Sequence, residues 1–497
     1  MRTLSKSKLL AFRQCPKRLW LEVHQPEARE DSSATQASYA TGYRVGDIAR
    51  QIYDPRGQGQ LIDPQAEGFD AAFARTHALL QSAQPIFEAG FSAEGALAFA
   101  DVLVPTSRPR GGWRMVEVKS STSVKDYHRD DAAVQSFLAR ACGVPLQSIA
   151  LAHIDSQWTY PGDGDYRGLL VEEDLTEEAF ARTDEVRGWI VDAHAITTRR
   201  KPPSVATGAH CSDPYECGFF THCSSQEPQA EYPVHWLPRR SQALKAHIQK
   251  QGIAELCDVP DDLLNPLQQR VKTATLSGQP FFDQNAAAQA LAAHKLPGYF
   301  IDFETIQFAV PLWPGTRPYQ QLPFQFSVHR LGRTGRATHH AFLDLSGGNP
   351  SRAFAQALLA ACGERGPIFV YNAAFETTRL RELAERHPHL SQALLALNDR
   401  VVDLLPIARQ HYYHPSQQGS WSIKALLPAL CPELRYDALD GVQDGGAAQQ
   451  AYLEAIAEGT SAARKEALER QLLAYCHLDT WAMVRLWAAF TAMTLKD

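Results

Sequence analysis

The cysteines of this 497-residue chain follow a pattern that constrains its fold. Cys15 stands alone near the start, whereas Cys211, Cys217 and Cys223 come together almost two hundred residues later. Nine cysteines are an odd count and too sparse for a disulfide scaffold in so long a chain, so a local cluster indicates metal ligation in a reducing compartment. A centre shared by all four cysteines would pin the two ends of residues 1–225 together.

The spacing within the cluster bears on what it binds. The three clustered cysteines are separated by five residues each time, unlike the paired C-x-x-C knuckles of zinc fingers. Three close thiolates need a fourth ligand, and four thiolates favour an iron–sulfur cluster, with Cys15 completing the set. A zinc site that adds Cys15, His210 or His222 to the three is an alternative, as are buried cysteines that bind nothing.

The length of the chain predicts more than one domain, because 497 residues with 44% hydrophobic content can fill two or three separate cores. A polar, Pro-containing stretch after Cys223 marks the end of a first domain, and helical patterns then continue until a strand-like run begins. Strand and helix patterns alternate in the rest of the chain. We therefore expect a multidomain α/β protein with domains at residues 1–225 and 296–497 and a helical connector at 226–295.

Charge and hydropathy indicate which binding partners and which cell compartment to expect for the protein. The net charge of -6 and the pI of about 6.3 show no overall positive charge that would indicate nucleic-acid binding. Binding to nucleic acid would therefore need local basic patches. The start of the chain lacks an uninterrupted apolar stretch, and no run of about 18 apolar residues follows, so we expect a soluble cytoplasmic protein without membrane contact. No GxxxxGK[ST] phosphate loop is present, so we expect no ATP site. Movement along DNA would require a helicase or motor partner.

An Asp, a Glu and a Lys lie within the segment that the cysteines bracket. Two apolar, strand-like runs are joined by a turn at 106–112, which predicts a hairpin. Asp101 lies on the first strand, while Glu117 and Lys119 share one face of the second. Two carboxylates can hold a divalent ion against a phosphodiester, and a lysine can position or deprotonate the attacking water. An isolated E-x-K pair is more often a solvated edge, but the apolar flanks and a following helix with Gln135 favour a hydrolytic site.

This arrangement resembles the core motif of the PD-(D/E)XK nuclease superfamily, and Gln135 matches a Gln that many RecB-like members carry on the following helix. The resemblance implies a restriction-endonuclease-like α/β core in which Asp101 and Glu117 bind Mg²⁺ or Mn²⁺. It also makes Lys119 and Gln135 part of the catalytic set. RecB-like nucleases often have a His in an early helix and an aromatic residue after the Gln, and this chain has other residues there: Val45, Gly46 and Ala139.

One Cys before the nuclease core and three after it is also the order found in the iron–sulfur nucleases of the RecB-like class, which include CRISPR-associated exonucleases and AddB-type helicase–nucleases. The resemblance implies a [4Fe–4S] cluster held by four ligands, Cys15, Cys211, Cys217 and Cys223. Its expected role is structural, because it would staple the N-terminal helix to the end of the domain. Chelation or oxidation would then destabilise the nuclease core.

A second group of acidic residues lies in the last two hundred residues. Asp302 and Glu304 stand two apart in the apolar run YFIDFETI and share one face of a strand. Tyr475 and Asp479 lie one turn apart in a C-terminal helix, so both side chains project from the same side. Between these segments, a strand-to-helix stretch carries Glu376. Acidic residues that stand at strand ends by chance are the alternative.

In this order the three segments resemble the DEDDy pattern of DnaQ-like 3′–5′ exonucleases, which have a ribonuclease H-like fold. The resemblance implies that Tyr475 orients the attacking water and that two divalent ions bind to four carboxylates: Asp302, Glu304, Glu376 and Asp479. Most members have Asp where this chain has Glu376, so the second ion would sit differently or Asp403 would assist. A Ser-x-Lys helix before the last motif implies a phosphate contact from Lys424, for which a solvated helix charge is the alternative.

The connector offers a weaker signal for nucleic acid. Four basic residues are expected on its first helix, where they could track phosphates or form an ordinary solvated face: Arg239, Arg240, Lys245 and Lys250. Taken together, the motifs predict a divalent-metal-dependent nuclease that acts on DNA, with single-stranded ends as substrate, exonuclease activity favoured over endonuclease activity, and a role in repair or defence. The alternatives are a nucleic-acid-binding or assembly protein with inactive centres, and a ribonuclease.

Overall fold

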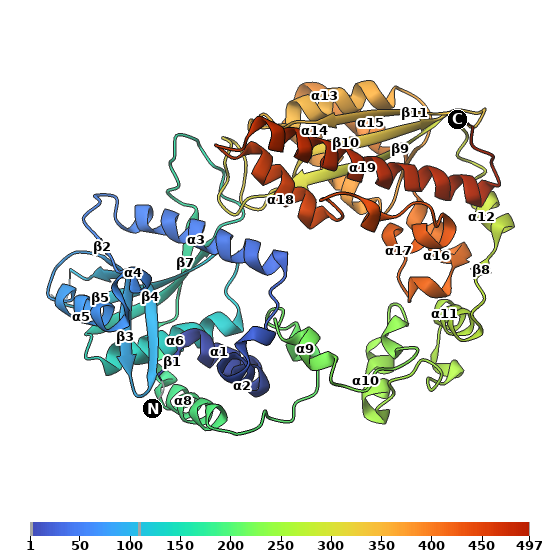
Figure 1. Cartoon of the computed structure of the whole chain (residues 1–497). Helices are drawn as coiled ribbons and strands as arrows, with labels where there is room; N and C mark the ends of the chain where they lie inside the picture. Colours follow the sequence, from blue (N-terminus) through green and yellow to red (C-terminus); the bar gives the residue numbers. More distant parts are fainter. Residues whose placement is uncertain (1–2, 108–110, 497) are drawn as a thin grey trace. The chain divides into compact units, whose positions relative to one another are not determined.

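The computed structural model describes residues 3–107 and 111–496 (Figure 1). Its contacts divide the chain into two compact units. Unit 1 contains the residues up to Pro228 together with Phe308–Gln320, and unit 2 contains Gln229–Gln307 and the residues from Gln321 onward. The helices of the expected connector at 226–295 therefore belong to unit 2, while a short segment between two strands of unit 2 belongs to unit 1.

Unit 1 contains a mixed sheet with the strand order β2-β3-β4-β5-β6-β7, and β1 pairs with β4 beside this path. β3, β4 and β5 run antiparallel in sequence, and β6 then returns parallel to β5. The strands are β1 (Leu4–Ser5), β2 (Gln60–Leu61), β3 (Ile86–Ala93), β4 (Ala96–Pro105), β5 (Trp113–Lys119), β6 (Leu146–Ile154) and β7 (Leu170–Asp174).

The predicted hairpin is the antiparallel pair β4–β5, which confirms that part of the sequence analysis. Arg108, Pro109 and Arg110 of its predicted turn lie outside the described residues. The turn before it, between β3 and β4, consists of Glu94 and Gly95, both with positive φ. Two such residues are typical of the tight turns whose twist matches that of the flanking strands.

Nine helices of the described part of unit 1 surround this sheet: α1 (Lys6–Gln14), α2 (Pro16–His24), α3 (Ser33–Tyr53), α4 (Pro64–Glu67), α5 (Phe69–Leu79), α6 (Asp126–Ala141), α7 (Thr176–Ala181), α8 (Thr183–Thr197) and α9 (Phe220–Ser224). α6 connects β5 to β6, which is the long crossover that a parallel strand pair requires. The main apolar core includes residues of the strands, of α6 and of α8, and α6 is buried along most of its length.

Unit 2 contains a five-stranded sheet with the order β11-β10-β9-β12-β13. β10 is antiparallel to both β9 and β11, whereas β12 is parallel to β9 and to β13. In sequence order the central strand is therefore the first one, followed outward by the second and third on one side and the fourth and fifth on the other. The strands are β9 (Gly298–Ile306), β10 (Leu322–Leu331), β11 (Ala337–Leu343), β12 (Ile368–Val370) and β13 (Val401–Asp403), with a separate pair β8 (Phe281–Phe282) and β14 (Tyr412–Tyr413).

Ten helices of the described residues belong to unit 2: α10 (Gln242–Gln251), α11 (Pro266–Ser277), α12 (Gln284–Leu291), α13 (Ser351–Cys362), α14 (Ala374–Arg386), α15 (Ser391–Asn398), α16 (Leu404–His411), α17 (Ile423–Leu430), α18 (Gly445–Ile456) and α19 (Ala462–Thr491). α19 packs along β9 and β10 (Figure 1). Several helices begin at a side chain that accepts a backbone N–H bond, such as Asn265, Ser422 and Ser461.

The alternation of β9 divides its side chains between two cores. Phe300 packs in the core that contains α19, whereas Ile301 and Phe303 pack in the core with α13, α14 and α15. Since side chains of a strand alternate, Asp302 and Glu304 are on the same face as Phe300, toward α19. The fold is therefore α/β with two units, each with its own sheet and cores. No helix within 3–107 or 111–496 has the length and apolar character needed to cross a membrane.

Candidate metal centres

Unit 1 brings the predicted residues of its first centre together beside the β4–β5 pair. Lys119 Nζ lies 2.6 Å from Glu117 Oε1, which confirms that the two side chains share a face. Gln135, from α6, donates to Glu117 Oε2 through its side-chain amide. Asp101 lies on the neighbouring strand, and its Oδ2 accepts a 2.7 Å bond from the backbone N–H of Val118.

Two further residues complete this group. Asp131, one turn before Gln135 on α6, lies 2.6 Å from Lys119 Nζ and accepts a 2.9 Å bond from the Gln135 amide. Lys6, at the start of α1, lies 3.0 Å from a carboxylate oxygen of both Glu117 and Asp131. Two lysines and two carboxylates thus form a closed ion-pair cluster in which Glu117 is 1% exposed.

Burial and charge together set the protonation of this cluster. Burial alone would lower the pKa of Lys119, but the carboxylates of Asp131 and Glu117 outweigh it and hold the pKa well above its usual value. For Asp131, burial opposes ionisation, but Lys119 and Lys6 lower its pKa below the usual range. Asp101 behaves differently, because burial and the nearby Glu117 raise its pKa. Asp101 therefore has a stronger tendency to hold a proton than Asp131.

A cavity of about 570 Å³ gives access to the centre. It is lined by Asp101, Glu117 and Lys119 and by Glu88, which stands on β3 between the partners of Val102 and Ala100. Burial and Glu117 raise the pKa of Glu88, as expected for a carboxyl that faces other carboxyls in a desolvated space. Glu88, Asp101 and Glu117 therefore border one cavity, which Asp47 also lines, and such a set of carboxyls is suited to a divalent cation.

The four predicted cysteines of unit 1 line one small pocket. Cys15 stands between α1 and α2, Cys211 ends the short helix η2 (Ala209–Cys211), and Cys223 lies in α9. Cys217 is tied to the same place by a 2.8 Å bond from its backbone N–H to the carbonyl of Cys211. The structure therefore brings the lone cysteine and the three clustered ones together, as the sequence predicted. A donor set of four thiolates fits an iron–sulfur cluster.

The two histidines considered as alternative ligands differ in their position relative to the pocket. His210 lines the pocket, with its Nε2 3.6 Å from the sulfur of Cys211. His222 instead shares a 3.0 Å bond with the amide of Gln226. Lys17 and Arg18 also line the pocket, so cationic groups lie beside the thiols. Burial raises the pKa of the Cys217 and Cys223 thiols, and the charges of Arg18 and Lys17 oppose this rise in favour of the thiolate form that metal ligation needs.

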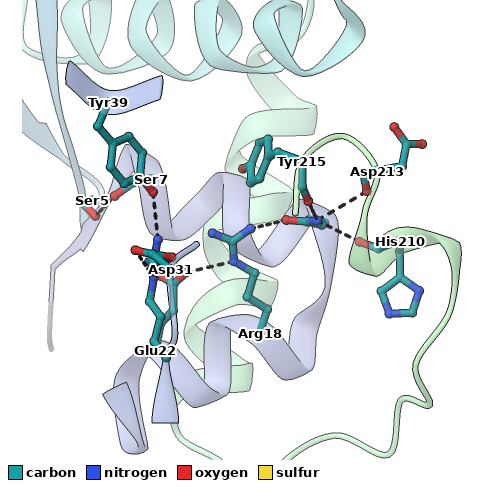
Figure 2. A network of polar contacts seen from close by, with 11 residues as sticks. Ser5, Ser7, Arg18, Glu22, Asp31, Tyr39, His210, Asp213 and Tyr215 are labelled. Atoms are coloured by element: carbon teal, nitrogen blue, oxygen red, sulfur yellow. Dashed lines mark hydrogen bonds and ion pairs between the residues drawn. The ribbon is translucent and has the colours of Figure 1, made fainter. Parts of the chain in front are cut away.

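A polar network fastens the cysteine-bearing segment to the start of the chain (Figure 2). The side-chain amide of Gln14, next to Cys15, donates 2.8 Å bonds to the carbonyls of both His210 and Tyr215. Arg18 binds the other side of this amide, and its guanidinium also lies 5.1 Å from the ring centre of Tyr215. These contacts hold the N-terminal helices of unit 1 against the segment that carries Cys211 and Cys217, and they involve protein groups alone.

In unit 2 three of the four predicted carboxylates converge, and Glu376 is not in this group. The carboxylates of Asp302 and Glu304, from β9, and of Asp479, from α19, have ligand atoms within 4.8 Å of one another. The register explains this meeting, since both β9 residues face α19. Burial and the neighbouring Asp479 raise the pKa of Glu304 to about 8 and that of Asp302 well above its usual value. Three carboxyls this close without a cation oppose one another, which is the electrostatic condition that a divalent ion relieves.

Aromatic and cationic groups surround Asp479. Tyr436, in the short helix η7 (Tyr436–Ala438), donates a 2.6 Å hydrogen bond to its Oδ1. Burial raises the pKa of Asp479 to about 6, while the bond from Tyr436 and the charge of Lys424 hold it lower than it would otherwise be. Tyr475 is buried one turn before Asp479, and Lys424 Nζ lies 4.9 Å from its ring centre. Lys424 thus lies beside the acidic centre, where its Nζ also donates a 2.9 Å bond to the carbonyl of Gln443, and the phosphate contact expected from the sequence stays a prediction.

Glu376 and Asp403 have different roles in the structure. Glu376 lies in the first turn of α14, is 3% exposed, and has one carboxylate oxygen without a hydrogen-bond partner among the described residues. Burial raises its pKa to about 8. A buried oxygen without a donor is the situation that a bound cation would satisfy. Asp403 instead accepts backbone N–H bonds from Asn372, Ala373 and Leu405, so it caps chain segments here.

Sequence reasoning missed Lys6, Glu88, Asp131 and Tyr436. Asp131 had a usable signal, because it stands four residues before Gln135 and the two side chains share a helix face. Glu88 faces Asp101 only after the strands pair, and the other two come from segments distant in sequence. The expected basic helix of the connector is partly wrong, because α10 begins at Gln242 and excludes Arg239 and Arg240.

Comparison with known protein families gives a match over part of the chain. A domain of unknown function (DUF2779) matches residues 299–422. This stretch contains Asp302, Glu304 and Glu376 but ends before Tyr436 and Asp479, so it covers part of the acidic centre. No curated protein matches the chain.

Proposed function

We propose that this protein is a divalent-metal-dependent nuclease that hydrolyses phosphodiester bonds of DNA, with single-stranded ends as substrate. The observation that carries the proposal is the meeting of Asp302, Glu304 and Asp479 with ligand atoms within 4.8 Å. Buried carboxyls with raised pKa values are stable as anions only beside cations, and Mg²⁺ or Mn²⁺ prefers oxygen ligands of this kind.

Two features of the fold support a DnaQ-like, ribonuclease H-like assignment for unit 2. The sheet has its first strand in the centre, with the second and third antiparallel on one side and the fourth and fifth parallel on the other. This strand order is the one that the resemblance implies, and β9 carries the first two carboxylates. We therefore assign 3′–5′ exonuclease-type chemistry to this centre.

The residues of this centre have distinct tasks in the proposal. Asp302, Glu304, Glu376 and Asp479 would hold the ions, which would polarise the phosphate and stabilise the charge that develops during hydrolysis. Tyr475 would orient the attacking water through its hydroxyl. Lys424, which faces the rings of Tyr475 and Tyr436, is positioned to attract a phosphate oxygen of the DNA backbone.

We also propose that unit 1 is a RecB-like PD-(D/E)XK domain with a [4Fe–4S] cluster. The helix–three strands–helix–strand order of α5, β3, β4, β5, α6 and β6 supports this, as does the cavity beside Asp101, Glu117 and Lys119. Lys119 would hold the attacking water by donating to it or accept its proton. The cluster would be bound by Cys15 and the three clustered cysteines and would have a structural role.

A second candidate function for unit 1 is DNA binding without cleavage. The observation that favours it is that Glu117 already receives three protein donors, from Lys6, Lys119 and Gln135. A cation could bind to Glu117 only by displacing one of them. In this case unit 2 would catalyse hydrolysis and unit 1 would bind the DNA without cleaving it.

The test uses the full chain purified with its cluster intact. End-labelled single- and double-stranded DNA, and RNA of the same sequence, are incubated with Mg²⁺ or Mn²⁺. Asp302→Asn and Glu117→Gln remove the two centres one at a time. We expect single-stranded DNA to be degraded fastest and Asp302→Asn to abolish exonucleolytic products. If neither DNA nor RNA is degraded with either ion, the proposal is overturned. If RNA is degraded fastest, the proposed substrate becomes RNA.

A further inference from the structure

Unit 2 contains a second group of potential metal ligands, which the nuclease proposal does not use. His329 on β10, His339 on β11 and His477 on α19 each offer a ring nitrogen, and these nitrogens lie within 4.8 Å of one another. The three ring centres are 4.5–4.7 Å apart. Three imidazoles that meet from three different elements form a compact set of ligands.

The strand register explains why these residues meet. His329 and His339 are direct cross-strand partners in the β10–β11 pair. His329 is also the partner of Phe300 on β9, so it is on the face of the sheet that packs against α19. α19 then supplies His477 two residues before Asp479. One helix therefore serves both the carboxylate group and the histidine group.

Hydroxyl groups orient two of the three rings. Thr480 Oγ1 lies 2.8 Å from Nδ1 of His329, and Ser327 Oγ lies 2.9 Å from Nε2 of His339. The two hydroxyls also bind each other at 2.6 Å. Each hydroxyl engages one ring nitrogen and leaves the other available, which is how the neighbours of metal-binding histidines usually fix the ring.

We propose that His329, His339 and His477 bind one divalent transition-metal ion of the Zn²⁺ class. Imidazole nitrogen is a preferred ligand of this class, and Zn–N bonds of about 2.0–2.1 Å place tetrahedral nitrogens about 3.3 Å apart, which small side-chain rotations achieve from the present spacing. The three histidines border a cavity of about 730 Å³. The fourth coordination position faces this cavity and takes a water molecule. This site is separate from the proposed nuclease activity and does not depend on it.

The proposed ion would fasten an exposed part of unit 2. β11 is the edge strand of the five-stranded sheet, and most of its side chains are exposed. The ion would join α19 to the β10–β11 pair, whose two strands already share a backbone ladder at His329 and His339. We therefore expect the ion to stabilise unit 2 against unfolding, since it binds the folded arrangement and not the unfolded chain.

The first test counts bound zinc in the full-length protein. Wild type, His339→Ala, His477→Ala and His340→Ala are dialysed against Zn²⁺ in excess Mg²⁺, which occupies the carboxylates, and metal is measured by mass spectrometry. The cysteine pocket is the same in all four proteins. We expect His339→Ala and His477→Ala to hold one equivalent less than wild type, and the neighbouring His340→Ala to match wild type. Equal zinc content in all four would overturn the proposal.

A second test uses only the wild-type protein, so it does not depend on the folding of a variant. Diethyl pyrocarbonate modifies accessible imidazole nitrogens, and peptide mass spectrometry locates the products. We expect Zn²⁺ to protect His339 and His477 at least about 10-fold while His340 reacts at an unchanged rate. Equal modification of all three histidines with and without Zn²⁺ would also overturn the proposal.

Discussion

The hydroxyl of Tyr436 donates a 2.6 Å hydrogen bond to Oδ1 of Asp479. This bond joins a short helix between α17 and α18 to the carboxylate on α19 that completes the acidic centre. It stabilises the ionised form of Asp479 and so acts against the burial that raises the pKa of this residue to about 6. Tyr436 is therefore a positioning residue for the proposed metal site.

Tyr436→Phe should weaken divalent-metal binding. Loss of the hydrogen bond raises the pKa of Asp479 further and frees its side chain, and loss of such a partner typically costs about 10- to 100-fold in metal affinity. We expect the Mg²⁺ concentration for half-maximal nuclease activity to rise by this factor, with recovery at high Mg²⁺. The matched control is Tyr452→Phe, because the buried hydroxyl of Tyr452 has no partner among the described residues. An unchanged Mg²⁺ requirement in Tyr436→Phe would contradict the role of this bond.

The acidic centre should make stability depend on pH when no metal is bound. Burial raises the pKa of both Glu304 and Glu376 from 4.5 to about 8, so the folded state binds more protons than the unfolded state between these values. The resulting stability is fully present below about pH 4.5 and is lost as the pH rises through about 8. We expect the Tm of unit 2 in EDTA to fall over this range, and Mg²⁺ to remove most of the decline. A metal-free Tm that rises from pH 6 to 8 would contradict the sign.

Glu376→Gln should raise the stability of the metal-free protein at high pH and lower its nuclease activity. At pH 9 the wild-type carboxylate is ionised and buried, so the neutral amide should raise the unfolding free energy of the metal-free protein by on the order of 1–3 kcal/mol. The same change removes a proposed metal ligand, so the stabilisation by Mg²⁺ and the nuclease activity should both fall. Thermal unfolding with and without Mg²⁺, at pH 6 and pH 9, measures both effects. A loss of stability at pH 9 would show that the carboxylate is satisfied without metal.

Asp131→Asn should damage unit 1 more than the neighbouring Asp130→Asn. Asp131 is 3% exposed and pairs with Lys6 and Lys119, whereas Asp130 is 15% exposed and pairs with Arg13 and Arg182. Because Lys6 and Lys119 keep 20% and 23% exposure, we expect about 1–3 kcal/mol of destabilisation, less than the 3–5 kcal/mol typical of a fully buried pair. Asp130→Asn should cost below about 1 kcal/mol. Chemical denaturation of both variants gives the comparison, and equal costs would contradict the assigned importance of the cluster.

Cys217→Ser should remove the proposed cluster and loosen unit 1. We expect the anaerobically purified variant to lose the broad absorbance near about 400 nm that an iron–sulfur cluster gives, and limited proteolysis to cut within residues 200–225. The Asp302 centre lies in unit 2 and should retain its activity. Cys257→Ser changes an exposed cysteine of unit 2 and serves as the control. A colourless wild-type protein that contains zinc would redirect the assignment of the cysteine site.

Much of the local structure could be predicted from the sequence. The alternation of YFIDFETI predicted one strand face for Asp302 and Glu304, and the E-x-K spacing predicted the contact of Glu117 with Lys119. The α/β class and the β4–β5 hairpin are also confirmed. These properties depend on the period of a strand or helix, which a short stretch of sequence contains.

The partners from distant segments could not be predicted in this way. Lys6 is 111 residues from Glu117, and Tyr436 is 43 residues from Asp479. Their contacts depend on how helices pack on a sheet, and no local period records this. The group of three histidines was not predicted from the sequence for the same reason, because β10, β11 and α19 meet only in the folded unit.

The sequence by itself determined which side chains share a face and that one cysteine stands apart from three. Only the tertiary structure decided which faces meet. It brought Cys15 to the pocket of the other three and placed two lysines beside Glu117. It also brought the carboxylates of β9 and the histidines of β10 and β11 to the same helix, α19. The physical reason is that backbone periodicity acts over a few residues, whereas burial of apolar faces selects among pairings that span the whole chain.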